Sequence, residues 1–145
     1  MIEFDVDDYD EIIDHAKDGK PYEICGVLAG ERGEKEATVE KIYDCENVSE
    51  TPETNYLIDP QEQFEIVEAI EDEGLDVVGF YHSHPEGPFR TSETDADRAT
   101  WTGHSYVIVS LGDDEPKVGS WIWTGDEFER EEIEVDGDSR ETSTD

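Results

Sequence analysis

Two histidines one residue apart are the residues in this sequence best suited to chemistry. His82 and His84 follow the apolar run 76–81 (DVVGFY), which predicts a central strand. Side chains at i and i+2 of a strand point to the same face, so the two imidazoles can converge on one metal ion. Asp95, at the start of a predicted helix, can lie back as a third ligand. Two imidazoles and one carboxylate leave an open fourth position on tetrahedral Zn²⁺, which is the pattern of catalytic zinc sites.

Each of these residues also has a simpler interpretation. Ser92 and Asp95 fit a plain helix N-cap, with the serine accepting a backbone N–H bond and the acid near the positive end of the helix. A His-x-His triplet is common in polar loops. Two histidines and one carboxylate also describe the facial triad of non-haem Fe(II) oxygenases. The residue types alone leave these alternatives open.

The spacing of two separated motifs resembles the JAMM motif of MPN-domain metalloproteases. Segment 82–95 reads His-x-His, then seven residues, then Ser-x-x-Asp. Upstream, segment 23–30 (EICGVLAG) is similar to the Glu-x-Cys-Gly-x-Leu-x-Gly segment of that family. The resemblance covers nearly the whole chain. One departure is Thr91, where the family often has proline, and we expect it to change loop stiffness rather than chemistry.

The resemblance implies a role for each matching residue. His82, His84 and Asp95 would hold one zinc ion per chain. Glu23 would accept a proton from the attacking water and return it to the leaving amine. Ser92 would donate a hydrogen bond to the oxyanion formed from an amide or isopeptide carbonyl. The chain would then be a JAMM-type zinc metalloprotease.

The resemblance also implies a substrate class. It predicts an isopeptidase that removes ubiquitin-like small archaeal modifier proteins from lysines of target proteins. Two alternatives are a peptidase that processes the C-terminus of a sulfur-carrier precursor and a non-catalytic MPN scaffold. The chain has no room for large insertions, so fine linkage selectivity is not expected. Family members often pair through this domain, which leaves a homo-oligomer open.

The net charge of the chain limits the kinds of partner that we expect. Lys and Arg number 10 and Asp and Glu 42, which gives a net charge of −32. Such a surface repels phosphate, so nucleic acid and anionic membranes are not expected partners. An acid excess of this kind is typical of halophilic cytoplasmic proteins, and we expect the fold to loosen at low ionic strength. The acidic N-terminus lacks the features of a signal peptide, and no apolar run approaches the ~20 residues of a membrane span.

The periodicity of apolar residues predicts an α/β domain with a mixed sheet flanked by helices, and the resemblance implies the MPN fold, which is cytidine-deaminase-like. We expect one domain over residues 1–135 and a disordered acidic tail over 136–145. The predicted elements are a helix at 8–18, a hairpin of strands 25–31 and 37–43, a short strand at 55–58, a helix from Pro60 with Phe64, Val67 and Ile70 on its apolar stripe, a helix at 92–100, and strands at 105–111, 118–124 and 128–135.

The remaining candidates favour structural roles. Cys25 has no histidine close in sequence, so a buried core thiol is a better interpretation than a nucleophile. Trp121 and Trp123 share one strand face and predict packing. His15 lies among acids on an amphipathic helix, which predicts a solvated side chain, and His104 precedes a strand and is interpreted as structural.

Overall fold

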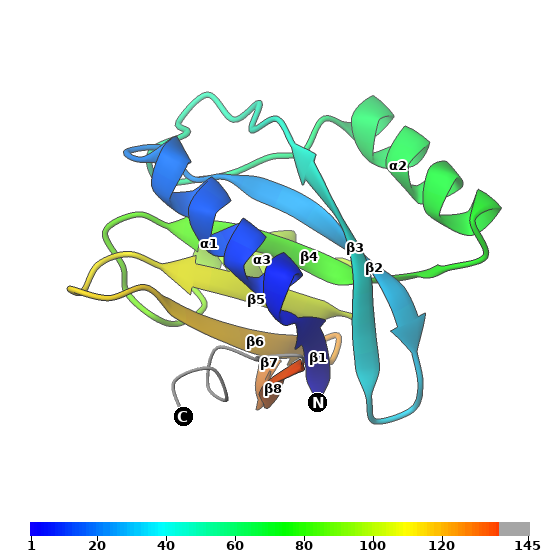
Figure 1. Ribbon diagram of the computed structural model, residues 1–145. Helices are drawn as coiled ribbons and strands as arrows, with labels where there is room; N and C mark the ends of the chain where they lie inside the picture. Colours follow the sequence, from blue (N-terminus) through cyan, green and yellow to red (C-terminus); the bar gives the residue numbers. More distant parts are fainter. Residues whose placement is uncertain (137–145) are drawn as a thin grey trace, which may run out of the picture.

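The computed structural model of the chain describes residues 1–136, except the side chains of Thr94, Asp97 and Arg98 (Figure 1). The described residues form three helices and eight strands. In chain order these are β1 (Ile2–Asp5), α1 (Val6–Gly19), β2 (Cys25–Arg32), β3 (Ala37–Cys45), α2 (Pro60–Asp72), β4 (Asp76–His84), α3 (Glu93–Arg98), β5 (Ser105–Ser110), β6 (Lys117–Trp123), β7 (Phe128–Glu131) and β8 (Ile133–Asp136).

All eight strands belong to one mixed sheet with the order β7-β6-β5-β4-β2-β3-β1-β8. The β4–β5, β1–β3 and β1–β8 pairs are parallel, and the other pairs are antiparallel. β7 and β8 are separated only by Glu132 in the chain, yet they occupy opposite edges of the sheet. The sheet must therefore curl until its two edges approach each other, which makes it nearly closed. This confirms the predicted mixed sheet with flanking helices.

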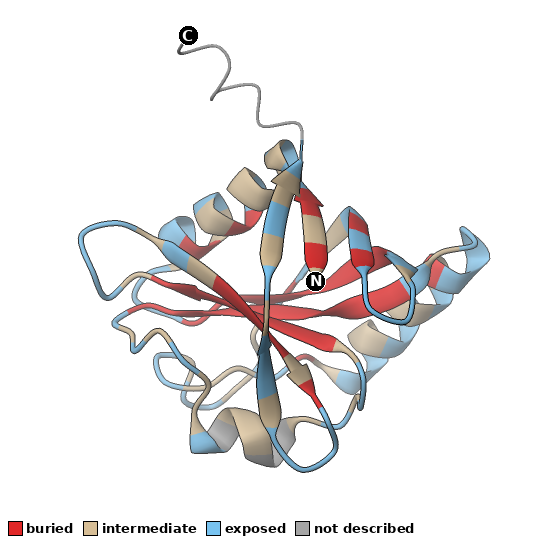
Figure 2. Cartoon of the chain, turned by 90° about the horizontal axis from the view of Figure 1, so that it is seen from below, coloured by how far each residue is buried: buried red, intermediate tan, exposed pale blue. Residues whose placement is uncertain are grey.

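The helices cover the two faces of the sheet separately. On one face, Ile12 and Ala16 of α1 pack in a cluster with residues of β1 to β5 that includes Leu28 and Tyr81. On the other face, Ile70 of α2 packs in a second cluster that continues to Ala96 of α3. Figure 2 shows that buried residues concentrate in the central strands. These strands are near-continuous apolar runs because both of their faces are covered.

A β-bulge in β4 decides which face its C-terminal half presents. Leu28 of β2 pairs with Gly79, whereas the next residue, Ala29, pairs with Val77, so Val78 is an extra residue in β4. A bulge of this kind reverses the side-chain alternation beyond it. A Cβ on Gly79 would overlap the backbone of Ser105, so the close approach of β5 requires glycine there.

Two details of segment 55–72 differ from the prediction. Segment 55–58 is not a strand and shares only one isolated bridge, between Asn47 and Ile58, because it belongs to an irregular loop. Phe64 is 58% exposed because it lies about 120° around α2 from Ile70, at ~100° per residue, and the helix rests instead on Ile66, Val67 and Ile70.

The predicted strand 128–135 is two strands. It breaks at Glu132 so that β7 pairs with β6 and β8 pairs with β1. The prediction also missed β1, whose four residues alternate without a turn signal before α1. The tail predicted over 136–145 lies outside the described residues, except Asp136, which ends β8.

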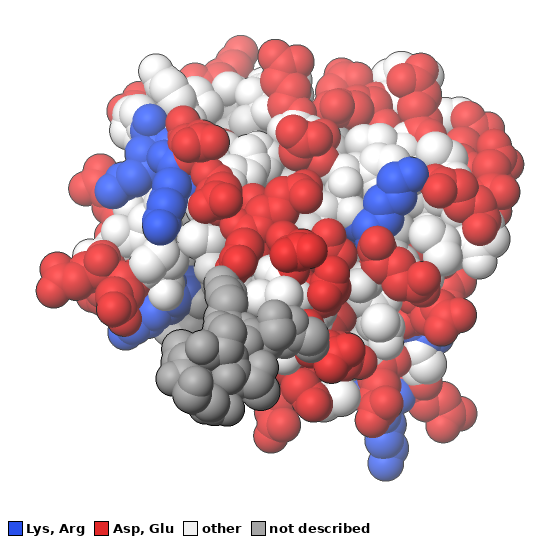
Figure 3. All heavy atoms as spheres, viewed as in Figure 1, with Lys and Arg blue, Asp and Glu red and all other residues white. Residues whose placement is uncertain are grey.

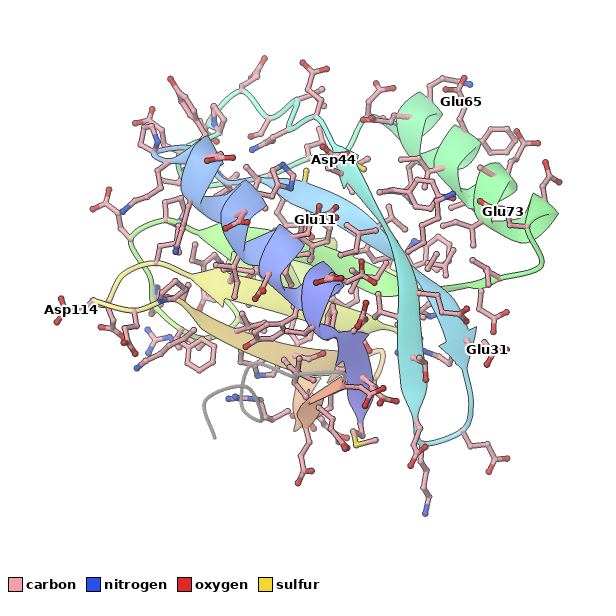
Figure 4. The ribbon with its side chains drawn as sticks, viewed as in Figure 1. Glu11, Glu31, Asp44, Glu65, Glu73 and Asp114 are labelled. Carbon is pink, nitrogen blue, oxygen red and sulfur yellow. The ribbon has the colours of Figure 1, made fainter. Side chains whose placement is uncertain are left out.

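Acidic side chains are the commonest charged groups on the face of the molecule seen in Figure 3, with Lys and Arg at scattered positions. In Figure 4 the labelled acids come from helices, strands and loops: Glu11 lies on α1, Glu65 on α2 and Asp114 in the β5–β6 loop, and Glu73 caps the C-terminus of α2. None of the described helices combines the length and apolar character needed to cross a membrane.

Candidate active site

Both histidines of the His-x-His segment lie at the C-terminal end of β4. His82 and His84 are buried, and they point to the face of the sheet covered by α2 and α3 because of the bulge at Val78. Ser83 points to the opposite face. Its Oγ accepts a hydrogen bond from the Ile24 backbone N–H at 2.9 Å, and its own N–H donates to the Ile24 carbonyl at 3.1 Å. This exchange ties the end of β4 to the segment before β2.

A capping box fixes the position of Asp95 at the start of α3. The Ser92 Oγ accepts a hydrogen bond from the Asp95 backbone N–H at 3.0 Å, and the Asp95 Oδ2 accepts one from the Ser92 N–H at 2.9 Å. The same carboxylate faces both imidazoles. Its Oδ1 lies 3.2 Å from the His82 Nε2, and its Oδ2 lies 3.3 Å from the His84 Nε2. The helix-cap interpretation and the site interpretation therefore both apply to this aspartate.

The three side chains form a group that could hold a metal ion. The two Nε2 atoms of His82 and His84 are 3.2 Å apart, close to one edge of such a site, and Asp95 approaches them through its two different carboxylate oxygens. One ligand atom from each of the three residues lies within 4.8 Å of the others. In a tetrahedral site with metal–ligand bonds of ~2.0–2.1 Å, neighbouring ligand atoms lie about 3.3–3.4 Å apart. Among the described residues, this trio is the group of acids, histidines and cysteines that could hold a metal ion. The residues present therefore fit zinc.

The two imidazoles are held in place differently. The His84 Nδ1 lies 2.9 Å from the Pro88 carbonyl, so its N–H donates there and its Nε2 keeps a lone pair for a metal. The His82 Nδ1 has no hydrogen-bond partner among the described residues. The ring of Tyr56 stacks on His82 instead, with centroids 4.4 Å apart and planes inclined by 23°. No sequence pattern pointed to Tyr56, because its segment is irregular.

The electrostatics of the trio favour an ionised aspartate. Burial opposes ionisation of Asp95, but the hydrogen bonds and charges of His82 and His84 hold its pKa well below the usual range. Burial lowers the pKa of His82. Burial also opposes protonation of His84, but hydrogen bonds to Asp95 and Pro88, with the Asp95 and Glu23 charges, raise its pKa overall.

Glu23 lies outside the metal-binding trio but shares its cleft. Its side chain is only 6% exposed. Together with His84 and Ser92 it lines a cleft of about 360 Å³ that is floored by the 84–88 loop. Glu23 is not one of the three residues that could together hold a metal ion. The roles of these residues stay predictions, while their meeting in one cleft is a feature of the fold.

The segment after Glu23 has a packing reason for its glycine. A Cβ on Gly26 would overlap the ring of Tyr81 and the Tyr43 carbonyl, so only glycine allows β2 to lie this close. Next to it, Cys25 is fully buried, and burial raises the pKa of its thiol. A thiol that resists ionisation is a poor nucleophile, which agrees with a core role.

The outlying aromatic candidates have packing roles, with one correction. Trp121 and Trp123 are buried, as predicted. The solvated interpretation of His15 is wrong, because its Nδ1 is hydrogen-bonded to the Tyr81 hydroxyl at 2.9 Å and burial lowers its pKa. His104 contacts the ring of Trp101 and has no place in the site.

The described fold and site define a class, namely an α/β domain with a two-histidine, one-aspartate group that could hold a metal ion, near a buried glutamate. Residues 5–124 match the family of prokaryotic homologues of the JAB domain. The match spans most of the chain, and the chain belongs to this family.

Known relatives agree with this assignment. The chain is 42% identical over 131 residues to the desampylase of Haloferax volcanii, covering 88% of this chain and 91% of the relative. It is 36% identical over 102 residues to the CysO-cysteine peptidase of Mycobacterium tuberculosis, covering 70% of this chain and 68% of the relative. Among solved structures, a protein from Desulfitobacterium hafniense superposes with a TM-score of 0.84 at 32% identity, covering 93% of this chain and 92% of that one.

Proposed function

We propose that this chain is a zinc-dependent isopeptidase that removes ubiquitin-like small modifier proteins from lysines of target proteins, with residues 1–135 as its single catalytic domain. The observation that carries the proposal is the His82–His84–Asp95 trio, in which one carboxylate approaches both imidazoles and the three side chains form a group that could hold a metal ion. The similarity to a desampylase over 88% of the chain supports the substrate class.

The proposed reaction uses Glu23 and Ser92 for proton transfer and charge stabilisation. Zinc, when bound by His82, His84 and Asp95, supplies a Lewis acid that polarises a carbonyl and makes water more acidic. The Glu23 carboxylate accepts one proton of the attacking water as its oxygen bonds to the carbonyl carbon. The Ser92 hydroxyl donates a hydrogen bond to the oxyanion, while its oxygen still accepts the Asp95 N–H bond. Glu23 then gives its proton to the lysine amine as the C–N bond breaks.

A specific similarity favours a second candidate function. The similarity to a CysO-cysteine peptidase over 70% of this chain supports a peptidase that processes the C-terminus of a sulfur-carrier precursor at the same site. The similarity to a desampylase is higher and covers more of the chain, so this function stays the second candidate. The two functions differ in the leaving group, which is a lysine side-chain amine in one and a backbone α-amine in the other. A linear fusion and an isopeptide conjugate of the same modifier separate them.

The charge supports a proposal about the working environment. The net charge of −32 is spread over helices, strands and loops, so self-repulsion is strong in dilute buffer. At molar salt the Debye length is ~3 Å, which screens this repulsion. We therefore place the enzyme in a high-salt cytoplasm.

The test is cleavage of a modifier–lysine conjugate by the zinc-loaded protein in molar salt. We expect cleavage to stop on chelation and to return with zinc but not to require Fe²⁺ or O₂. Glu23→Gln and His84→Ala are expected to lose activity. Glu31→Gln serves as the matched control and keeps it, because Glu31 is exposed near the far end of β2, the strand that follows Glu23. Undiminished cleavage by Glu23→Gln and His84→Ala would refute the proposal. Protein that holds no zinc would favour the scaffold alternative.

A further inference from the structure

The side chain of Asn47 uses all four of its hydrogen-bonding positions. Its Nδ2 donates to the Glu23 carbonyl at 2.9 Å and to the Asn55 carbonyl at 3.0 Å. Its Oδ1 accepts from the N–H groups of Ser49 and Leu57, each at 3.0 Å. A flipped amide would place oxygen against two carbonyls and NH₂ against two donors, so only one orientation satisfies the network. The half-buried side-chain amide of Asn47 thus links both ends of a loop to the backbone of Glu23.

This loop, residues 46–58, holds both main-chain polar groups of Glu23. The Glu23 carbonyl accepts from Asn47, and the Glu23 N–H donates to the Pro52 carbonyl at 2.7 Å. The neck of the loop is closed by the Val48 N–H, which donates to the Leu57 carbonyl at 2.9 Å. These contacts matter because Glu23 precedes β2, which begins at Cys25, and lies outside the pairing of the sheet.

We propose that Asn47 is a positioning residue of the reaction, which sets where the Glu23 carboxylate stands relative to His84 and Ser92. The inference rests on the proposed function, in which Glu23 is the base. Asn47 is not among the described residues that line the cleft, so it acts through Glu23 and not on the substrate. A misplacement of ~1 Å of a reacting group costs about 10²-fold in rate, so loss of this anchor is expected to lower kcat strongly.

The first test is Asn47→Asp. This change keeps the shape and the acceptor oxygen but replaces the donor NH₂ with a second oxygen that faces two carbonyls. The matched control is Asn55→Asp, the same substitution in the same loop, where the side chain donates only to the hydroxyls of Thr51 and Thr54. With a modifier–lysine conjugate, we expect kcat to fall at least about tenfold in Asn47→Asp, with KM and zinc per chain unchanged. The control is expected to keep the wild-type kcat.

The second test separates positioning from a general structural role. Asn47→Asp is combined with Glu23→Gln, and residual cleavage is followed in single turnovers at high enzyme concentration. If Asn47 acts through Glu23, its substitution changes little once the carboxylate is gone, because the two effects are not additive. A merely structural role would lower the rate by the same factor in both backgrounds, and this result would overturn the proposal.

The remaining outcomes are also decisive. If Glu23→Gln alone cleaves like the wild type, the proposed function fails, and this inference fails with it. If Glu23→Gln is inactive while Asn47→Asp keeps full kcat, only the inference fails. Loss of zinc from Asn47→Asp would assign the amide to the metal group instead and would also overturn it. Asn47→Ser, which removes the donor without adding charge, is the second variant; if neither variant folds, the amide serves the fold and the proposal is wrong.

Discussion

Replacement of Ser92 separates the two roles of this hydroxyl, helix cap and oxyanion donor. Ser92→Ala removes both the 3.0 Å bond from the Asp95 N–H and the donor that faces the cleft. Replacement of an N-cap serine by Ala costs ~1 kcal/mol of stability, whereas replacement by Gly costs only a few tenths of a kcal/mol. Loss of one oxyanion donor lowers kcat by about 10²–10³, or ~3–4 kcal/mol. Ala and Gly are therefore expected to differ in stability but to share one catalytic defect.

The assay measures kcat on a modifier–lysine conjugate and the free energy of unfolding in molar salt. We expect Ser92→Ala to lose both stability and activity, Ser92→Gly to lose only activity, and Ser92→Thr, which keeps a hydroxyl, to retain most of both. The Asp95 carboxylate keeps its bond from the backbone N–H of residue 92 in all three variants, so zinc content is expected to stay constant. If Ser92→Gly keeps the wild-type kcat, the hydroxyl serves only as a helix cap and the oxyanion role is refuted.

Three further predictions test other parts of the structure. Burial, then the charges of neighbouring acids, raise the pKa of Asp8 to about 6, so its charged form destabilises the fold as pH rises from the unfolded value of 3.8 through 6. Asp8→Asn is therefore expected to raise the unfolding free energy at pH 7.5 by roughly 1 kcal/mol after discounting for solvent screening, and by less in molar salt. The control is Asp7→Asn at an exposed position, which is expected to change the unfolding free energy little. Equal unfolding curves for Asp8→Asn and wild type at pH 7.5 in low salt would contradict this prediction. Tyr56→Leu removes the ring stacked on His82 and is expected to weaken zinc binding about tenfold in competition with a chelator, and unchanged affinity would show that the stack does not orient the imidazole. Gly79→Ala is expected to destabilise the protein by several kcal/mol in chemical denaturation, because its Cβ would displace the β5 backbone, and a normal denaturation midpoint would refute that close approach.

Sequence patterns predicted most of the secondary structure where local signals were strong. Asp59 and Pro60 predicted the start of α2, and the Asp59 side chain accepts the Glu62 N–H bond at 3.1 Å. Periodicity failed where an element is short or where its packing face is set from a distance. The sequence could not show that α2 turns Phe64 outward, because the buried stripe depends on where the helix rests on the sheet.

The candidate site was predictable in its members but not in its supports. His82, His84, Ser92, Asp95 and Glu23 have characteristic types and spacing, and the structure places all of them around one cleft or trio. Tyr56 and Asn47 carried no signal because an aromatic ring or an amide in an irregular loop is ordinary. Their significance depends on long-range neighbours that sequence spacing does not encode.

The sequence by itself determined the residue types available for chemistry, the strand and helix that carry them, and the charge of the surface. A two-residue alternation is local, so it places His82 and His84 on one common face of β4 but does not say which face. Only the tertiary structure decided that, since the extra residue Val78 reverses the alternation and turns both imidazoles toward Asp95 on α3. A bulge arises from pairing with a distant strand, here β2, and its energy depends on contacts that exist only after the sheet has formed.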